Sequence, residues 1–225
     1  MVTKAGETVA PRVPLSKERV LRTAVELADR GGSEAVSMRK LGQELGVDAM
    51  SLYHHVRSKD DILDGIVDVV VGEIALSSPG TDWKPVLRRQ VMAARRVMLR
   101  HPWAPGVIEA RAEPGPATMR YMEAVLTILR DGGFALGLAH HAMHVLGSRV
   151  LGFNQDLFDD SAASRADPAV ASLMARQLAG TYPYIAELAV AVSHDGGLGG
   201  CDDDIEFAFG LDLIIDGLER LRAAG

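Results

Sequence analysis

The chain has 225 residues, of which 48% are hydrophobic and 24% charged, a composition that supports a sizeable core and excludes a disordered protein. Twenty-four Lys and Arg against thirty Asp and Glu give a net charge of −6, which argues against a generally polybasic protein. The single cysteine, Cys201, excludes an intramolecular disulfide and a zinc cluster of thiolates. No signal peptide or membrane span is predicted, so we expect a cytoplasmic protein.

The charge is unevenly distributed along the chain. Residues 1–66 hold ten basic and ten acidic side chains, whereas residues 67–225 hold fourteen basic and twenty acidic ones. A surface that binds a polyanion is therefore expected in the first segment rather than in the second.

The first helix is predicted over residues 17–31, after a polar arm at 1–13. Apolar residues recur with helical spacing from Val20 to Ala28, Ser16 is a suitable N-cap, and Gly31-Gly32 ends the pattern.

Two shorter helices follow, and a longer one comes after them. One begins after Ser37 and ends at Gly46, and the next runs from about Ala49 to His54. Ser58 is the expected N-cap of the longer helix, and Asp61 replaces the usual Glu of a capping box.

The rest of the chain also has helical periodicity, with no alternating β-branched run that would predict a sheet. Proline and glycine separate the segments, and Pro183 is expected to kink or split one of them. Helices are expected at about 85–101, 114–131, 135–157, 168–192 and 203–223, with Pro102, Pro105, Pro114, Pro116, Pro168 and Gly132-Gly133 between them. The predicted fold class is all-α.

The segment 37–56 reads SMRKLGQELGVDAMSLYHHV and predicts a helix-turn-helix. Two helices this short bury their apolar faces only if the turn at Gly46 sends one across the other, with helix 17–31 completing a small core. In DNA-binding proteins the second helix of such a pair enters the major groove. The alternative is a three-helix packing unit without a DNA role.

The side chains expected to contact DNA are hydrogen-bond donors, cations and small apolar groups that suit phosphates and base edges. They are Ser37, Arg39, Lys40, Ala49, Met50, Ser51, Tyr53, His54 and Lys59. Lys59 lies in the first turn of a helix, where a cation opposes the helix dipole, and a bound phosphate would explain it there.

Three motifs make this region similar to the N-terminal domain of the tetracycline-repressor (TetR) family. They are the Leu-Gly-Val turn at 45–47, Leu-Tyr-x-His at 52–55 and Lys-x-x-x-Leu at 59–63. The resemblance spans about fifty residues here, and the run Phe-Gly-Leu-Asp-Leu-Ile-Ile at 209–215 resembles the last helix of the tetracycline repressors themselves. It implies a ligand-responsive, homodimeric regulator of transcription.

The last helix, 203–223, is apolar on more than one face, which predicts packing against a second chain. The alternative is burial of both faces against this chain's own body. The resemblance implies a four-helix dimer interface made by this helix and the one near 135–157 of each chain.

The resemblance also implies an effector chamber in the body. In tetracycline repressors a histidine holds the magnesium of the drug chelate, but Ile108 or Glu109 stands at that position here. The expected chamber is mostly apolar and suits a larger or more hydrophobic ligand. Its expected contacts are Gln90, Ala94, Met98, Trp103, Met119, Met122, Val125, His140 and Met143, although each methionine taken singly is better explained as core filling.

His140 and His144 are four residues apart and share a helix face, as metal-binding histidines do. No third ligand lies nearby in the sequence, so no metal site and no cofactor are predicted, and a ligand contact or a surface role is preferred. A helical metal-binding protein or enzyme that uses this cluster is the alternative function.

The main hypothesis is a transcriptional regulator rather than an enzyme, most simply a repressor that a small molecule releases from its operator. We expect a DNA-binding domain over 14–62 and a domain for ligand binding and dimerisation over 63–225. The expected partners are double-stranded operator DNA, a small-molecule effector and a second copy of the chain, without a membrane.

Overall fold

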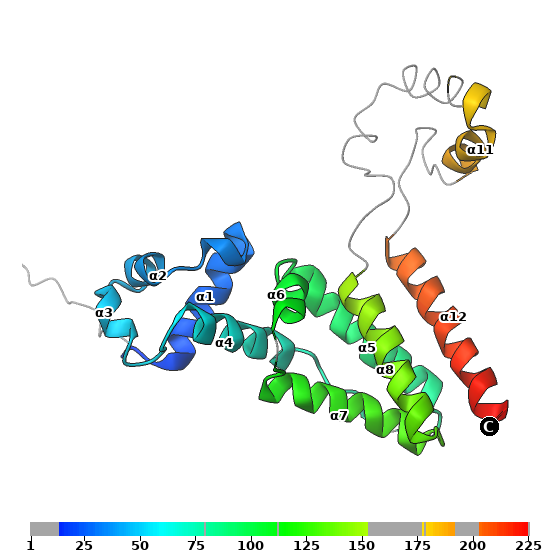
Figure 1. Cartoon of the computed structure of the whole chain (residues 1–225), viewed down its shortest axis with the longest axis horizontal. Coiled ribbons are helices and arrows are strands. Elements are labelled where there is room, and N and C mark those ends of the chain that lie inside the picture. Colours follow the sequence, from blue (N-terminus) through cyan, green and yellow to red (C-terminus); the bar gives the residue numbers. More distant parts are fainter. Residues whose placement is uncertain are drawn as a thin grey trace, which may run out of the picture. The chain divides into compact units, whose positions relative to one another are not determined.

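The computed structural model describes residues 14–78, 80–111, 113–152, 177, 179–191 and 203–224 (Figure 1). Every regular element in these ranges is a helix, which confirms the predicted all-α fold. The chain forms two compact units, one from residues up to Leu76 with Met92–Ala124 and the other from Ser77–Val91 with the residues from Val125 onward. No helix in the described ranges is long and apolar enough to cross a membrane.

The first helix, α1 (Lys17–Gly31), begins and ends where the sequence predicts. The Ser16 hydroxyl accepts a hydrogen bond from the Arg19 N–H at 3.2 Å, and Gly32 leaves the helix with φ of 73°. The predicted apolar stripe is the buried face, made of Val20, Leu21, Ala24, Val25, Leu27 and Ala28. A single 3₁₀ turn that the sequence does not predict, η1 (Ser33–Ala35), follows.

The predicted helix-turn-helix is α2 (Met38–Leu45) followed by α3 (Ala49–Leu52). Gly46 takes the left-handed conformation with φ of 65°, which a side chain would strain. The second helix is shorter than the predicted 49–54. It has one turn, capped by the Asp48 carboxylate and anchored by the fully buried Leu52, and the chain leaves the helix at Tyr53.

The fourth helix is α4 (Lys59–Gly72), and its cap differs slightly from the usual capping box. The Ser58 hydroxyl accepts from the Asp61 N–H at 3.1 Å, as predicted, but the Asp61 carboxylate accepts from the Arg57 N–H at 2.9 Å. A Cβ on Gly65 would lie 2.5 Å from a methyl carbon of Leu21, so this glycine allows α1 and α4 to approach closely.

One helix of the described ranges is not predicted by the sequence: α6 (Ala104–Ala110), between α5 (Trp83–Arg100) and α7 (Pro116–Asp131). Pro105 was interpreted as a separator, but it lies in the first turn, where a residue without an N–H costs the helix nothing. The helices predicted at 85–101 and 114–131 correspond to α5 and α7 with shifts of one or two residues.

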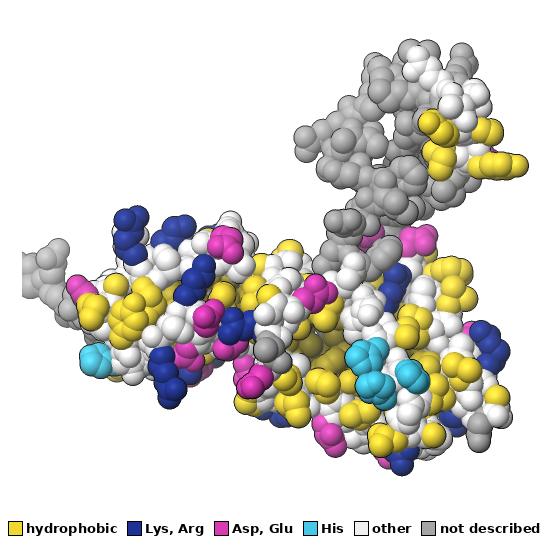
Figure 2. All heavy atoms as spheres, viewed as in Figure 1, with side chains coloured by type: hydrophobic (Ala, Val, Ile, Leu, Met, Phe, Trp, Pro, Cys, Tyr) yellow, Lys and Arg dark blue, Asp and Glu magenta, His cyan; other side chains and the backbone are white. Residues whose placement is uncertain are grey.

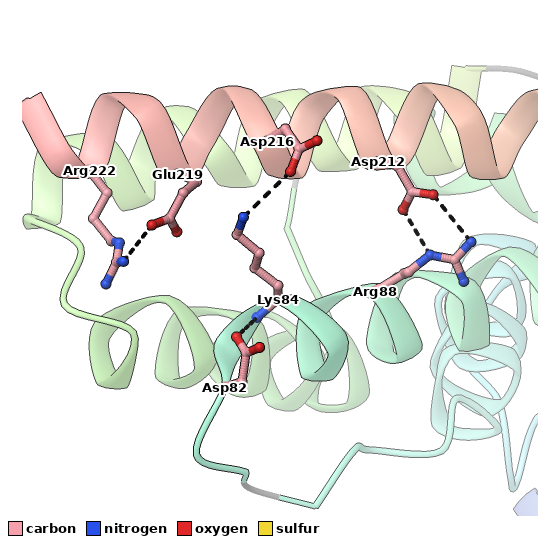
Figure 3. A network of polar contacts seen from close by, with 7 residues as sticks. All are labelled: Asp82, Lys84, Arg88, Asp212, Asp216, Glu219 and Arg222. Atoms are coloured by element: carbon pink, nitrogen blue, oxygen red, sulfur yellow. Dashed lines mark hydrogen bonds and ion pairs between the residues drawn. The ribbon is translucent and has the colours of Figure 1, made fainter.

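In the second unit, α8 (Leu136–Gly152) packs along α12 (Asp203–Ala224). Both helices are predicted by the sequence. The last part of the first prediction, residues 153–157, lies outside the described ranges. Ion pairs join α12 to the first half of α5, with Arg88 Nε 2.8 Å from Asp212 and Lys84 Nζ 3.5 Å from Asp216 (Figure 3). Of the predicted helix 168–192, the described part includes α11 (Pro183–Ala191), and its start confirms the expected split at Pro183.

Candidate nucleic-acid interface and effector-binding residues

The first candidate site is the outward surface of α2, α3 and the start of α4. Arg39 and Lys40 are exposed in the first turn of α2. Met50 is 71% exposed and Tyr53 49% exposed, although both are large and partly apolar, whereas Leu52 between them is fully buried. The core therefore holds this segment by Leu52 and leaves its neighbours free to contact another molecule.

Four other residues predicted to contact DNA lie on or beside α2 and α3. Ser37 is half-buried, and its hydroxyl accepts from the Lys40 N–H at 3.3 Å, so it caps α2. Ala49 and Ser51 are half-buried in α3, and His54 is exposed just after it. These residues thus lie on or beside α2 and α3, which pack against each other, and Lys59 lies at the start of α4.

The surroundings of Lys59 differ from those predicted from the sequence. Its ammonium nitrogen lies 3.6 Å from a carboxylate oxygen of Glu34, which belongs to the unpredicted turn η1. A carboxylate of the same chain therefore offsets the unfavourable position of this cation in the first turn of α4. A bound phosphate is therefore not needed to explain a cation at this position, because Glu34 already supplies a negative charge beside it.

A polar cluster that the sequence does not predict joins the ends of four helices in the first unit. The buried His101 ring lies between two carboxylates, with Nδ1 2.7 Å from Asp29 of α1 and Nε2 3.3 Å from Glu73 at the end of α4. The Trp103 indole N–H also donates to Asp29, at 2.7 Å, and Arg100 donates to Glu73 at 2.7 Å. The cluster ties α1 and α4 to the end of α5 and the start of α6.

The charges of this cluster shift the pKa of the Glu73 carboxyl. Partial burial alone would raise the pKa of its carboxyl, but hydrogen bonds from Arg100 and His101 outweigh burial and hold that pKa below its ordinary value. No sequence motif signals the cluster, because Asp29 and His101 are 72 positions apart.

A second set of contacts ties α4 to the far end of α6 and the start of α7. The Arg111 guanidinium lies 2.5 Å from Asp64 and 3.4 Å from Asp60, and the Ala117 N–H donates to the Asp68 carboxylate. The three aspartates follow one another at intervals of four residues, so they form a stripe along one face of α4.

The predicted effector contacts fall on several elements. Gln90, Ala94 and Met98 are spaced by four along one face of α5, and each is at most 3% exposed. Val125 of α7 is also buried. Met119 and Met122 of α7 are exposed by 54% and 37%.

The other predicted effector contacts differ in their surroundings. Trp103 already uses its indole N–H on Asp29. His140 is exposed on α8, and Met143 is half-buried there.

Gln90 is the most informative of these residues. Its side chain is fully buried, and its Oε1 accepts from the Ser77 N–H at 2.7 Å, which fixes the orientation of the amide. The Nε2 group has no hydrogen-bond partner among the described residues. A buried donor without a partner costs about 1–3 kcal/mol, so this group favours an acceptor that the described residues do not supply.

An apolar surface remains on the outward faces of α8 and α12, and yellow side chains are visible along α12 in Figure 2. Phe207, Leu211 and Ile215 of α12 are buried, but Phe209, Leu213 and Leu221 are exposed by 57–61%. On α8, Leu136 and Val145 are exposed by 68% and 48%. We call these five exposed residues the α8/α12 apolar surface.

Comparisons with known families match most of the chain. Residues 20–66 match the family described as bacterial regulatory proteins, tetR family, and residues 76–222 match the tetracyclin repressor-like C-terminal domain. The chain therefore belongs to the TetR family of transcriptional regulators.

Individual relatives agree with this assignment. The chain is 32% identical to the HTH-type transcriptional repressor DrrR1 of Streptomyces coeruleorubidus, over 95% of this chain and 80% of the relative. It is 40% identical to an HTH-type transcriptional regulator of Saccharopolyspora erythraea over 121 residues, which cover 53% of this chain and only about half (51%) of that relative. The crystal structure of Streptomyces coelicolor ActR in complex with actinorhodin superposes with a TM-score of 0.68 at 30% identity, over 93% of this chain and 99% of ActR.

Proposed function

We propose that this protein is a cytoplasmic, one-component transcriptional regulator that acts as a repressor. A homodimer binds a palindromic operator through residues 14–62, and a small, largely hydrophobic molecule bound by residues 63–225 lowers the affinity for DNA. DrrR1 is named as a repressor and ActR is crystallised with actinorhodin, so two relatives support the two halves of this proposal.

The DNA-binding half rests on the surface of α2 and α3. Leu41, Leu45 and Leu52 are buried beneath it, while Arg39, Lys40, Met50 and Tyr53 are exposed on it. This arrangement suits a recognition helix held by its core and offered to the major groove. We propose that the contacts are made by the nine residues named from the sequence.

The dimer is supported by the α8/α12 apolar surface. Exposed aromatic and aliphatic side chains of this size are unusual on a monomer and are stabilised when a second copy covers them. A dimer also presents two recognition helices to two half-sites. We propose that both copies meet through α8 and α12.

The effector half rests on the Nε2 group of Gln90, which has no partner among the described residues. This fully buried side chain offers one hydrogen-bond donor, which suits a mostly apolar molecule with a carbonyl or hydroxyl oxygen. The other predicted contacts remain part of the proposal. The alternative of an enzyme or metal-binding protein has no support in the comparisons, and we propose no catalytic role.

The effector proposal is tested by a screen of the full-length protein with aromatic compounds that carry carbonyl groups, using the unfolding temperature as readout. A compound that raises this temperature should bind about tenfold more weakly to Gln90→Met, because the donor to its oxygen is lost. Gln43→Met, an exposed position on α2, is the matched control. Equal affinity for Gln90→Met and wild type would place the ligand elsewhere.

A further inference from the structure

The positive charges of residues 14–66 differ in whether the chain itself neutralises them. This segment holds eight Lys and Arg side chains against nine Asp and Glu side chains, so it has no excess of positive charge. Its attraction for DNA therefore depends on which of the eight cations are already paired with carboxylates and which are not.

Five of the eight cations have partners within the chain. Four of them form ion pairs with N···O distances of 2.7–3.6 Å, namely Lys17–Asp61, Arg22–Glu18, Arg30–Glu44 and Lys59–Glu34. A fifth cation, Arg19, also interacts within the chain. All of these cations except Lys59 belong to α1, so the positive charge of that helix is largely neutralised.

The three remaining cations are Arg39, Lys40 and Arg57. All three are exposed, and none of them forms an ion pair with a carboxylate of the described ranges. Arg39 and Lys40 lie in the first turn of α2, and Arg57 lies between α3 and α4. The cations without a carboxylate partner therefore flank the helix-turn-helix, and only Arg57 is missing from the residues predicted to contact DNA.

The backbone of Arg57 is held in place although its side chain is not. Its N–H donates to the Asp61 carboxylate at 2.9 Å, and Val56 before it is only 1% exposed. The N–H groups of His55 and Val56 both donate to the carbonyl of Leu52, at 2.8 and 3.0 Å, so the chain makes a tight turn directly after α3. A fixed backbone thus carries the exposed guanidinium beside α3.

The two acidic side chains that follow Arg57 most closely in the sequence are engaged with other groups. The Asp60 carboxylate lies 3.4 Å from the Arg111 guanidinium. The Asp61 carboxylate accepts the backbone N–H of Arg57 and lies 3.4 Å from the Lys17 ammonium nitrogen. The Arg57 guanidinium is therefore available for an anion that the described residues do not supply.

We infer that the Arg57 guanidinium contacts a DNA phosphate, next to the phosphate contact proposed for Lys59. The inference rests on the proposed DNA-binding function and adds a tenth contact to the nine named from the sequence. Arg57 precedes Lys59 by two residues, so their Cα atoms are at most about 7 Å apart. Phosphates of one strand follow one another every ~3.4 Å along the duplex axis, so both cations can reach neighbouring phosphates. A planar guanidinium can donate to two phosphate oxygens at once.

The test is a titration of a fluorescent DNA duplex of mixed sequence with the full-length protein, followed by anisotropy at several NaCl concentrations. Phosphate contacts supply essentially all of the sequence-independent affinity, so this probe does not have to contain an operator. Arg57→Ala should weaken binding several-fold and reduce the slope of log affinity against log salt by about 0.9, because one phosphate contact is lost. The variant keeps the backbone N–H that donates to Asp61, and circular dichroism verifies that it is folded.

Two further variants distinguish a phosphate contact from a general loss of positive charge. Arg22→Ala removes the same side chain from α1, where Glu18 lies 2.7 Å from it, and should keep the slope of wild type. Arg57→Lys keeps the charge but not the planar guanidinium, so it should keep the slope and bind a few-fold more weakly than wild type.

The binding of wild type to the duplex tests the DNA-binding function itself, whereas the comparison of the variants tests the inference. A slope in Arg57→Ala equal to that of wild type would overturn the inference. So would an equal reduction of the slope in Arg57→Ala and Arg22→Ala, because the effect would then depend on total charge and not on position.

Discussion

The ammonium nitrogen of Lys59 lies 3.6 Å from a carboxylate oxygen of Glu34, at the edge of the surface that we propose faces DNA. The side chain of Glu34 is 93% exposed and that of Lys59 44% exposed, so water screens the pair and it contributes little to folding. A DNA phosphate at this position would compete with Glu34 for the same cation.

The first prediction follows from this competition. Lys59→Ala should weaken operator binding and reduce the slope of log affinity against log salt by about 0.9, because one phosphate contact is lost. Glu34→Gln should strengthen binding a few-fold, because Lys59 then no longer has to break an ion pair with Glu34 before it contacts a phosphate. Fluorescence anisotropy at several salt concentrations measures both effects.

Lys84→Ala is the control for this prediction, because Lys84 belongs to the second unit and pairs with Asp216. It should leave the salt dependence unchanged. An unaltered slope in Lys59→Ala would remove this lysine from the interface.

The helical elements were predictable from the sequence where local signals agree. Ser16 and Ser58 cap the helices that they were expected to cap, the helix expected after Ser37 begins at Met38, and Gly46 takes the turn that it was expected to take. The exception is α6, since proline in a first turn resembles proline in a loop when only the sequence is read.

The side-chain contacts were less predictable, because they depend on residues far apart in the chain. The ring of His101 between Asp29 and Glu73 has no local signature. The partner of Lys59, Glu34, lies in a turn that the periodicity did not reveal. Tertiary packing brings such residues together, and the local patterns of a single sequence carry no information on the distances between them.

The second prediction concerns stability in acid. The hydrogen bond from the Arg57 N–H, assisted by Lys17 and opposed by partial burial, lowers the pKa of Asp61 below its ordinary value of 3.8. A lowered carboxyl pKa stabilises the fold above the ordinary value, and this stability is lost as the pH falls through the folded-state pKa.

Asp61→Asn should therefore lower the free energy of unfolding near neutral pH by about 0.5–2 kcal/mol. It should also show a smaller loss of stability than wild type as the pH falls below about 4. Urea unfolding at a series of pH values measures both quantities, with Glu26→Gln on the exposed face of α1 as control. Parallel curves for wild type and Asp61→Asn would contradict the assignment.

The third prediction concerns the dimer. Phe209→Glu or Leu213→Glu places a carboxylate in the α8/α12 apolar surface and should convert a dimer into a monomer, because a buried unpaired charge is costly. Leu99→Glu introduces the same charge at a 45% exposed leucine of α5 and should remain dimeric. Analytical ultracentrifugation distinguishes these outcomes, and dimeric Phe209→Glu and Leu213→Glu proteins would show that another surface joins the copies.

The fourth prediction concerns tetracycline. Ile108 is half-buried and Glu109 exposed on α6. The sequence resemblance implies that one of them stands where tetracycline repressors have a magnesium-binding histidine. Without that imidazole, the magnesium chelate of tetracycline should bind weakly. A titration that follows tetracycline fluorescence measures it, and micromolar affinity would show that another residue supplies the ligand.

The central claim, that this chain is a sequence-specific DNA-binding dimer, is tested most directly by selecting duplexes from a random DNA pool with the full-length protein. The account predicts enrichment of one inverted repeat, with half-site centres about one helical turn, roughly 34–36 Å, apart. It also predicts that Tyr53→Ala, which alters an exposed residue beside α3, weakens binding to the selected duplex. A pool that remains random after repeated selection, with binding that depends on salt but not on sequence, would contradict the account.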